Sequence, residues 1–157
     1  HISNINNKLV LAIDGVQDPG NLGTIIRIAD WFGIAHIVCS PETVDAFSPK
    51  VVQATMGALA SVNVIYTPLN DFLTQIPPST PVYGTFMEGD NIYTEKLSTN
   101  GIIVLGNEGN GISPMIEQFI TQKLMIPDFS EGRKNTESLN VAMACAIVCS
   151  EFRRRYF

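Results

Sequence analysis

The sequence predicts one α/β domain, a mainly parallel β-sheet with helices on both faces. The chain has 157 residues, close to the ~150 residues typical of a single domain. Segments with strand character alternate with helical segments along its whole length, as in proteins built from β-α-β units. Several strand segments are continuous apolar runs, the pattern of strands buried on both faces of a parallel sheet. These observations together predict the fold class, with residues 1–157 forming a single domain.

The predicted strands are short runs rich in Val, Ile and Leu, bounded by turn-forming residues. The first (KLVLAID) ends at Gly15 and is followed by Asp18-Pro19-Gly20, and the fifth (GIIVL) is apolar throughout. In chain order the predicted strands are 8–14, 36–40, 61–66, 82–86, 101–105 and 123–126.

The predicted helices carry start and stop signals. Asn21 is the expected N-cap of the first helix and Gly33 its end, while Pro49 occupies the permitted first position of the second. Ser138 is the expected N-cap of the last and longest helix. In chain order the predicted helices are 22–33, 48–59, 69–75, 114–121 and 138 to about 155.

Composition excludes several classes of protein. Apolar residues make up 45% and charged residues 16%, so the chain is not disordered, and a net charge of −5 argues against a basic nucleic-acid coat or a polybasic membrane anchor. No apolar run reaches the ~18–20 residues of a membrane span, and no signal peptide opens the chain. Cys39, Cys145 and Cys149 form no C-x-x-C pair, which favours a reducing cytoplasm and predicts neither disulfides nor a metal site.

Three loops that follow predicted strands contain residues unusual for simple turns, at the sheet edge where such folds bind ligands. In the first loop, Gly20 and Gly23 allow close approach of a backbone or a ligand. Arg27 follows inside the run Ile25-Ile26-Arg27-Ile28-Ala29, where a buried guanidinium without a partner is costly. We expect Arg27 either to contact an anion or substrate or to extend to solvent from the helix edge.

The second loop places Gly106, Gly109 and Gly111 around the carboxylate of Glu108, which predicts tight backbone curvature around a ligand. The third loop runs from Ile126-Pro127 to the start of the last helix. Asn140 is expected within the first turn of that helix, where an amide is a mediocre helix former but is well placed to reach a ligand.

In order and spacing, these loops resemble the three motifs of the SpoU (TrmH) RNA methyltransferases, over residues from about Leu9 to Glu151. The matching residues are Asn21-x-Gly23-x-x-x-Arg27, Leu105-Gly106-Asn107-Glu108-Gly109 and Ile126-Pro127…Ser138-Leu139-Asn140-Val141.

The resemblance implies a C-terminal deep trefoil knot, the SPOUT fold. It also implies S-adenosyl-L-methionine as cofactor, a homodimer whose active sites draw on both subunits, and methyl transfer to a ribose 2′-hydroxyl of tRNA or ribosomal RNA. Many members carry an RNA-binding domain before the methyltransferase domain. Because this chain starts without Met close to the first strand, we expect it to lack such a domain.

The resemblance also implies roles for residues at matching positions. Arg27 is expected to stabilise developing charge or to bind an RNA phosphate; since an arginine stays protonated, it is a poor general base. The implied catalytic residues are Arg27, Asn21, Glu108, Ser138 and Asn140. The implied cofactor-binding residues are Gly106, Ile126, Leu139 and Thr85.

The third motif departs from the family pattern. Asp128 replaces the usual Met, and residues 129–137 make the connection longer. This longer loop carries Arg133 and Lys134. It is expected either to contact RNA or act as a lid, or to be a solvated surface loop, and the sequence favours neither. At the end of the last helix, Arg153-Arg154-Arg155 favours the helix dipole and is a candidate RNA contact.

Three alternatives remain open at this point. A knotted methyltransferase could act on a nucleobase, or the fold could serve a catalytically silent RNA-binding or assembly protein, although the intact polar motif residues argue against silence. A nucleotide-binding α/β module is disfavoured because the chain has neither G-x-G-x-x-G nor a phosphate-loop lysine.

Overall fold

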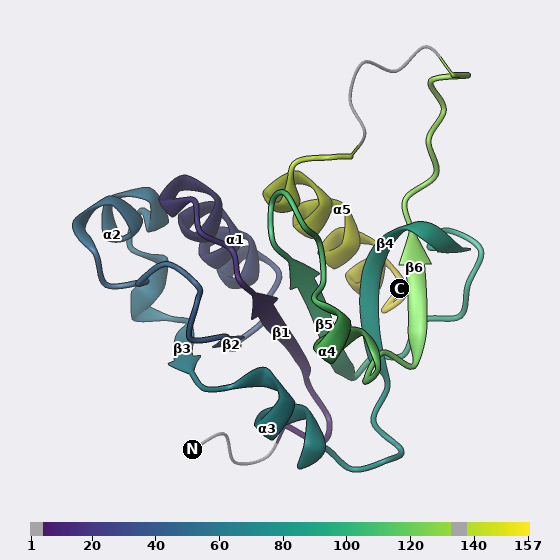
Figure 1. Ribbon diagram of the computed structural model, residues 1–157, viewed down its shortest axis with the longest axis horizontal. Coiled ribbons are helices and arrows are strands. Elements are labelled where there is room, and N and C mark those ends of the chain that lie inside the picture. The colour runs from purple at the N-terminus through teal and green to yellow at the C-terminus, as the bar shows by residue number, and fades with distance from the viewer. Residues whose placement is uncertain (1–4, 133–137) are drawn as a thin grey trace.

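The computed structural model describes residues 5–132 and 138–157, which contain a six-stranded sheet in the order β3-β2-β1-β5-β4-β6 (Figure 1). All pairings between these strands are parallel, which confirms the predicted sheet. The strands are β1 (Leu9–Asp14), β2 (His36–Cys39), β3 (Asn63–Tyr66), β4 (Val82–Asn91), β5 (Gly101–Gly106) and β6 (Gln122–Met125).

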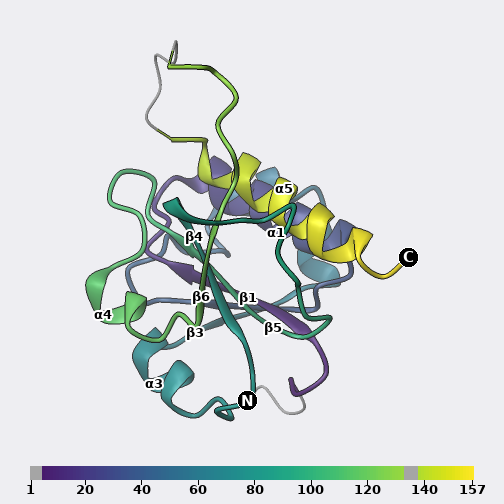
Figure 2. The ribbon, with the colours of Figure 1, turned by 90° about the vertical axis from the view of Figure 1, so that its right-hand side faces the viewer.

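Helices cover both faces of the sheet, as predicted (Figure 2). Helices α1, α2 and α5 lie on one face, while α3 and α4 lie on the other. The helices are α1 (Pro19–Trp31), α2 (Pro49–Thr55), the 3-10 turn η1 (Ala58–Ala60), α3 (Leu69–Thr74), α4 (Pro114–Glu117) and α5 (Val141–Arg154).

The central strand β1 shows why its sequence is apolar throughout. Leu9, Leu11 and Ile13 pack into the core beneath α1 and α5, while Val10 and Ala12 pack into the core beneath α3 and α4. Successive side chains of a strand point to opposite faces, so a strand covered on both faces has no position for a polar residue. The apolar runs in the sequence were therefore reliable markers of the central strands.

Both expected N-caps are wrong. Helix α1 starts one turn earlier than predicted, because the Asp18 carboxylate accepts the N–H of Asn21 at 2.9 Å and Pro19 opens the helix. Helix α5 is capped by Asn140 and not by Ser138, since the Asn140 side chain accepts the N–H groups of Ala142 and Met143. Other predicted boundaries also shift. Helix α4 ends at Glu117, before its predicted end at residue 121, and helix α1 ends at Trp31 and not at Gly33.

The second helix stops at Thr55, before its predicted end, because Met56 adopts a left-handed conformation with φ of 52°. Strand β4 runs to Asn91, beyond its predicted end at residue 86. Both Thr85 and Asp90 pair with Leu124 of β6, so the intervening residues 86–89 leave the ladder as a bulge.

The arginines that end α5 bind the protein's own backbone. Arg153 donates to the carbonyls of Phe32 and Gly33 at the end of α1, at 2.7 and 3.1 Å. Arg155 donates to the carbonyls of Ile92 and Glu95, at 2.9 and 2.8 Å. These two guanidiniums are therefore structural, and the suggested RNA contact loses its main donors.

Glu151, only 6% exposed, accepts hydrogen bonds from both Arg154 and Arg155 one turn further along α5. A buried carboxylate is costly unless it is paired, and these guanidiniums supply the pairing. No helix within the described ranges has the length and apolarity needed to cross a membrane. The trefoil knot implied by the resemblance stays a prediction.

Gly23 provides a test of the helix packing. A Cβ placed there would lie 2.3 Å from the Cβ of Ala54 on α2, so α1 and α2 approach closely only because Gly23 has no side chain. We predict that Gly23→Ala lowers the free energy of unfolding by about 1–3 kcal/mol. This is the net effect: the steric cost of the added methyl group exceeds the ~1 kcal/mol by which alanine is favoured over glycine in a helix.

Denaturant unfolding measures the change, and Thr24→Ala on the exposed side of α1 is the matched control, expected to change stability by less than about 0.5 kcal/mol. Adding Ala54→Gly to the Gly23→Ala variant removes the closest contact and should recover part of the loss. A Gly23→Ala protein as stable as the wild type would contradict the packing argument.

Candidate active site

The carboxylate of Glu108 joins two loops at the carboxyl edge of the sheet. It accepts the backbone N–H of Gln17 at 3.0 Å and that of Asp18 at 2.7 Å. These residues follow β1, whereas Glu108 follows β5, the neighbouring strand. The chain builds β2 and β3 on one side of β1 and β4–β6 on the other, so the two loops meet at the point where strand order reverses, the usual ligand position in open α/β sheets.

The loop that carries Glu108 is shaped by its own neighbours. Asn107 and Gly111 exchange backbone hydrogen bonds of 3.0 Å, and the Asn107 side chain accepts the N–H groups of Gly109 and Asn110. The loop folds back so tightly that a Cβ on Gly106 would lie 2.2 Å from the carbonyl carbon of Gly111. The predicted tight curvature is confirmed, and Gly106 permits it.

Asn21 connects Glu108 to the last helix. Its Nδ2 donates to the Glu108 carboxylate at 3.2 Å, and its Oδ1 accepts the amide of Asn140 at 3.0 Å. The Asn140 Oδ1 meanwhile caps α5. The structure thus brings together three of the five predicted catalytic residues, one from each of the three loops.

Arg27 lies on the exposed side of α1, whereas Ile25, Ile26 and Ala29 of the same helix are buried. The guanidinium is therefore not buried, and the expected contact with an anion or substrate stays a prediction. Among residues 5–132 and 138–157, no hydrogen bond or ion pair reaches the Arg27 guanidinium, which leaves it available to an anion. Ser138 is exposed just before the α5 cap.

Three predicted cofactor-binding residues lie where neighbouring strands end. Gly106 ends β5, Thr85 is the last residue of β4 before its bulge, and Ile126 directly follows β6. Because β5, β4 and β6 are adjacent and parallel, these positions share one edge of the sheet. Leu139, half exposed, precedes the Asn140 cap. Arg133 and Lys134 lie outside the described residues.

Hydrogen bonding keeps Glu108 ionised. Partial burial by itself would raise the pKa of Glu108, but the N–H groups of Gln17 and Asp18 and the Asn21 amide bind the charged form. Their combined effect exceeds that of burial and holds the pKa below its ordinary value. Glu108 is therefore an anchor for the two loops and not a proton donor at neutral pH.

Several residues at this edge were missed from the sequence. Asn107 donates to the carbonyl of Gly15 at 2.7 Å, and Asp14 accepts the N–H of Ser113 at 2.7 Å. Asp18 could have been found, because an Asp followed by Pro is a standard helix start. The roles of Asn107 and Asp14 depend on which strands are neighbours, which no local pattern reveals.

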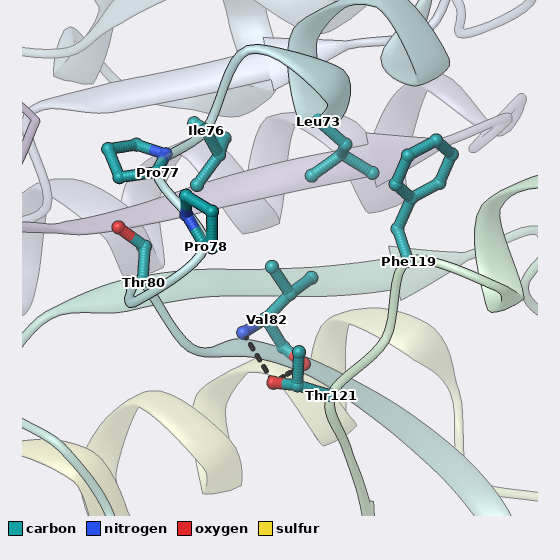
Figure 3. Close-up of a pocket in the computed structure, with 8 residues that line it drawn as sticks. All are labelled: Leu73, Ile76, Pro77, Pro78, Thr80, Val82, Phe119 and Thr121. Atoms are coloured by element: carbon teal, nitrogen blue, oxygen red, sulfur yellow. Dashed lines mark hydrogen bonds between the residues drawn. The ribbon is translucent and has the colours of Figure 1, made fainter.

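Two further observations concern metal binding and a separate pocket. In the part of the chain that the structure describes, no cluster of His, Cys, Asp and Glu is arranged to hold a metal ion. A pocket of about 120 Å³ lies between the end of α3, residues 76–80 and Phe119 (Figure 3). Its wall includes Val82, the first residue of β4, so it lies at the amino edge of the sheet, opposite the Glu108 cluster.

The fold and the cluster define an α/β domain with a candidate ligand site, at which three loops meet at the carboxyl edge of a parallel sheet. The model of the SpoU rRNA Methylase family matches residues 8–150. The chain therefore belongs to the SpoU rRNA methylase family, as the sequence motifs predicted.

Known proteins support this assignment. The chain is 35% identical to 23S rRNA (guanosine(2553)-2′-O)-methyltransferase RlmP of Bacillus subtilis (strain 168), over 93% of this chain and 58% of that protein. A solved structure of a Porphyromonas gingivalis protein assigned to the TrmH family of RNA methyltransferases is 50% identical, with a TM-score of 0.86, over 95% of this chain and 60% of that one.

The AdoMet-bound rRNA methyltransferase of Sinorhizobium meliloti is 32% identical, with a TM-score of 0.85, over 96% of this chain and 57% of that one. The chain thus spans a little under 60% of the length of the RlmP relative.

The pKa of Glu108 leads to a prediction on acid stability. A carboxyl group whose pKa is lowered on folding stabilises the fold above its unfolded pKa, and loses that contribution as the pH falls through the folded value. We expect Glu108→Gln to lower the free energy of unfolding at pH 7 by about 1–3 kcal/mol, the range for hydrogen bonds to a charged group. The difference from wild type should shrink as the pH falls below 4.5, the ordinary pKa of a glutamate.

Denaturant titrations between pH 7 and pH 3 measure the free energy of unfolding of the wild type and of Glu108→Gln. Glu42→Gln, at an exposed position, is the control and should show a small difference from wild type at every pH. A Glu108→Gln deficit that stayed constant down to pH 3 would contradict the role of the ionised carboxylate.

Proposed function

We propose that this protein transfers a methyl group from S-adenosyl-L-methionine to a ribose 2′-hydroxyl of ribosomal RNA. The observation that carries the proposal is the Glu108–Asn21–Asn140 cluster, which joins all three loops at the carboxyl edge while Arg27 stays exposed on the adjoining helix. RlmP and the S. meliloti protein are both described as rRNA methyltransferases, and the RlmP name specifies the guanosine 2′-oxygen. That name favours ribose over nucleobase methylation and rRNA over tRNA.

The residues at the edge suit the proposed cofactor. A side chain on Gly106 is excluded by the returning loop, so this strand end presents backbone groups only, beside the partly buried Ile126. Thr85 adds a hydroxyl from the next strand, and Leu139 an apolar side chain from the start of α5. Backbone groups and apolar side chains can bind an adenosine by hydrogen bonding and by packing against the base. The cofactor supplies an electrophilic methyl group.

The protein's own residues then have to orient the RNA. Methyl transfer by in-line displacement needs no covalent nucleophile, so correct placement of the 2′-oxygen accounts for most of the catalysis. Arg27 binds the adjacent phosphate or the 2′-oxygen while the hydroxyl proton passes to water, acting through its fixed positive charge. Glu108, Asn21 and Asn140 hold the start of α1, and so set the direction from which Arg27 approaches. Ser138 contacts the RNA side of the site.

Arg27 carries the direct test of this function. Arg27→Ala should lower turnover by about 10²-fold or more, the usual cost of removing one charge-stabilising donor. Binding of S-adenosylhomocysteine should change by less than about twofold, because Arg27 acts on the RNA. Arg27→Lys keeps the charge but loses the guanidinium geometry, and is expected to retain part of the activity.

Calorimetry measures the binding, and mapping of 2′-O-methyl groups in the RNA of cells with wild-type or variant protein measures the reaction. The mapping should show one ribosomal nucleotide losing its methyl group in the Arg27→Ala cells. An Arg27→Ala protein whose affinity for S-adenosylhomocysteine falls as much as its turnover would overturn the assignment of Arg27 to the RNA. No change in any 2′-O-methyl group when the gene is deleted would overturn the function.

The proposal includes a homodimer and a cytoplasmic location. Trp31 on α1 is 84% exposed and Met143 on the neighbouring α5 is 63% exposed, so this pair of helices presents large apolar side chains to solvent. Apolar groups of this size are usual at protein interfaces. Cys39, Cys145 and Cys149 are free thiols, which agrees with a reducing compartment.

Trp31→Lys tests the dimer. We expect the wild type to sediment with twice the mass of one chain, and the variant to dissociate about 30-fold more readily, since a buried interface tryptophan contributes ~2 kcal/mol or more. Met115→Lys, at an exposed position of α4 on the opposite face of the sheet, is the control and should remain dimeric. A monomeric wild type at micromolar concentration, or a Trp31→Lys dimer of unchanged affinity, would contradict the proposed interface.

A further inference from the structure

Two hydroxyl groups lie beneath the loop that contacts Glu108. Ser40 and Thr43, in the segment that follows β2, are only 3% and 5% exposed. Their side-chain oxygens lie 3.0 Å apart, and both accept the backbone N–H of Gly15, at 2.9 Å for Ser40 and 3.3 Å for Thr43. Neither residue belongs to the three motif loops.

The hydrogen atoms of this pair have one consistent assignment. Thr43 donates to the carbonyl of Ile13 at 3.4 Å, so Ser40 donates to Thr43, and the lone pairs that remain accept from Gly15. Each buried hydroxyl is then satisfied, as buried polar groups require. The only backbone amide that the pair binds is that of Gly15, among the residues that the structure describes.

Gly15 is held from both sides. Its N–H faces the hydroxyl pair, while its carbonyl accepts the side chain of Asn107 at 2.7 Å. Its φ of 79° lies in the left-handed region, which a residue with a side chain rarely adopts. The segment after β2 and the loop after β5 therefore grip the same residue, which fits the position of β1 between these two strands.

The segment that carries the hydroxyls is itself anchored to β3. The Tyr66 hydroxyl donates to the carbonyl of Val44 and accepts the N–H of Ala46 at 2.7 Å. Val44 in turn donates its N–H to the carbonyl of Val16 at 2.9 Å. A continuous hydrogen-bonded row thus runs from β3 across the ends of β2 and β1 to the loop after β5.

We infer that Ser40 and Thr43 are positioning residues for the active site: they hold Gly15 so that the N–H groups of Gln17 and Asp18 meet Glu108. This inference rests on the proposed function for its catalytic consequence. Releasing Gly15 lets the loop after β1 shift, and with it the start of α1, where Asn21 binds Glu108. Since Arg27 lies on the same helix, a shift there moves the group proposed to bind RNA. Among the described residues, the two hydroxyls make no hydrogen bond to the proposed cofactor residues at the ends of β4, β5 and β6. We therefore expect the affinity for the cofactor to stay unchanged.

The test combines Ser40→Ala with Thr43→Val, which removes both hydroxyls while changing side-chain volume little. Hydrogen exchange followed by NMR should show the Gly15 amide exchanging about tenfold faster or more, since its acceptors are lost. Turnover should fall about tenfold, a modest share of the loss that ~1 Å of misplacement can cause. Affinity for S-adenosylhomocysteine should remain within about twofold of wild type.

Two variants separate positioning from general stability. Thr43→Ser keeps the hydroxyl and should retain wild-type exchange at Gly15. Thr55→Val removes a similarly buried hydroxyl that donates to the Val52 carbonyl within α2, and it should leave both Gly15 exchange and turnover unchanged. If the double variant does not fold, Ser40→Ala alone supports the same comparison, since Ser40 makes the shorter bond to Gly15.

Gly15 exchange and turnover in the double variant that match Thr55→Val would overturn the inference. A drop in turnover with unchanged Gly15 exchange would overturn it as well, because the effect would then bypass Gly15. If the wild type binds no S-adenosylhomocysteine and methylates no RNA, the proposed function fails. In that case the exchange rate of the Gly15 amide alone would test whether Ser40 and Thr43 hold the loop after β1 in place.

Discussion

The carboxylate of Glu108 is the contact on which the geometry of the site depends. A parallel sheet brings the ends of β1 and β5 together but leaves the loops beyond them free to vary. Glu108 removes that freedom, because one charged group accepts the N–H groups of Gln17 and Asp18 and the amide of Asn21. Hydrogen bonds to a charged acceptor are stronger than neutral ones, so a partly exposed loop still has a defined shape.

The same constraint extends to the helices. Helices α1 and α5 lie side by side (Figure 2). They run in the same direction, since one set of contacts joins their starts and another joins their ends. Asn140 binds Asn21 at the start of the pair, and Arg153 binds the Phe32 and Gly33 carbonyls at the finish. A helix fixed at two points neither slides nor rotates freely. The exposed side chain of Arg27, between those points, therefore has a backbone of fixed orientation relative to the Glu108 cluster.

Local patterns predicted the fold class and the strand positions, because strands such as β1 and β5 are buried on both faces and must be apolar throughout. They failed where an interaction between distant residues determined the outcome. Asn21 and Ser138 have the right chemistry for helix caps, but Asp18 and Asn140 take those positions while Asn21 binds Glu108 instead. Motif resemblance identified the cluster residues, whereas Ser40 and Thr43 became visible only once β2 was known to lie beside β1.

The net negative charge of the chain and the contacts of its C-terminal arginines both disfavour non-specific binding to RNA. The net charge is −5, and two of the arginines that end α5 are occupied by backbone carbonyls. A protein of this charge gains little of the counterion release that drives non-specific RNA binding. Arg27, free of ion pairs among the described residues, is by contrast available to a phosphate beside the cluster. Phosphate contacts fix register and orientation. Under the proposed function, a contact from Arg27 would therefore favour RNA that already has the correct shape over RNA in general.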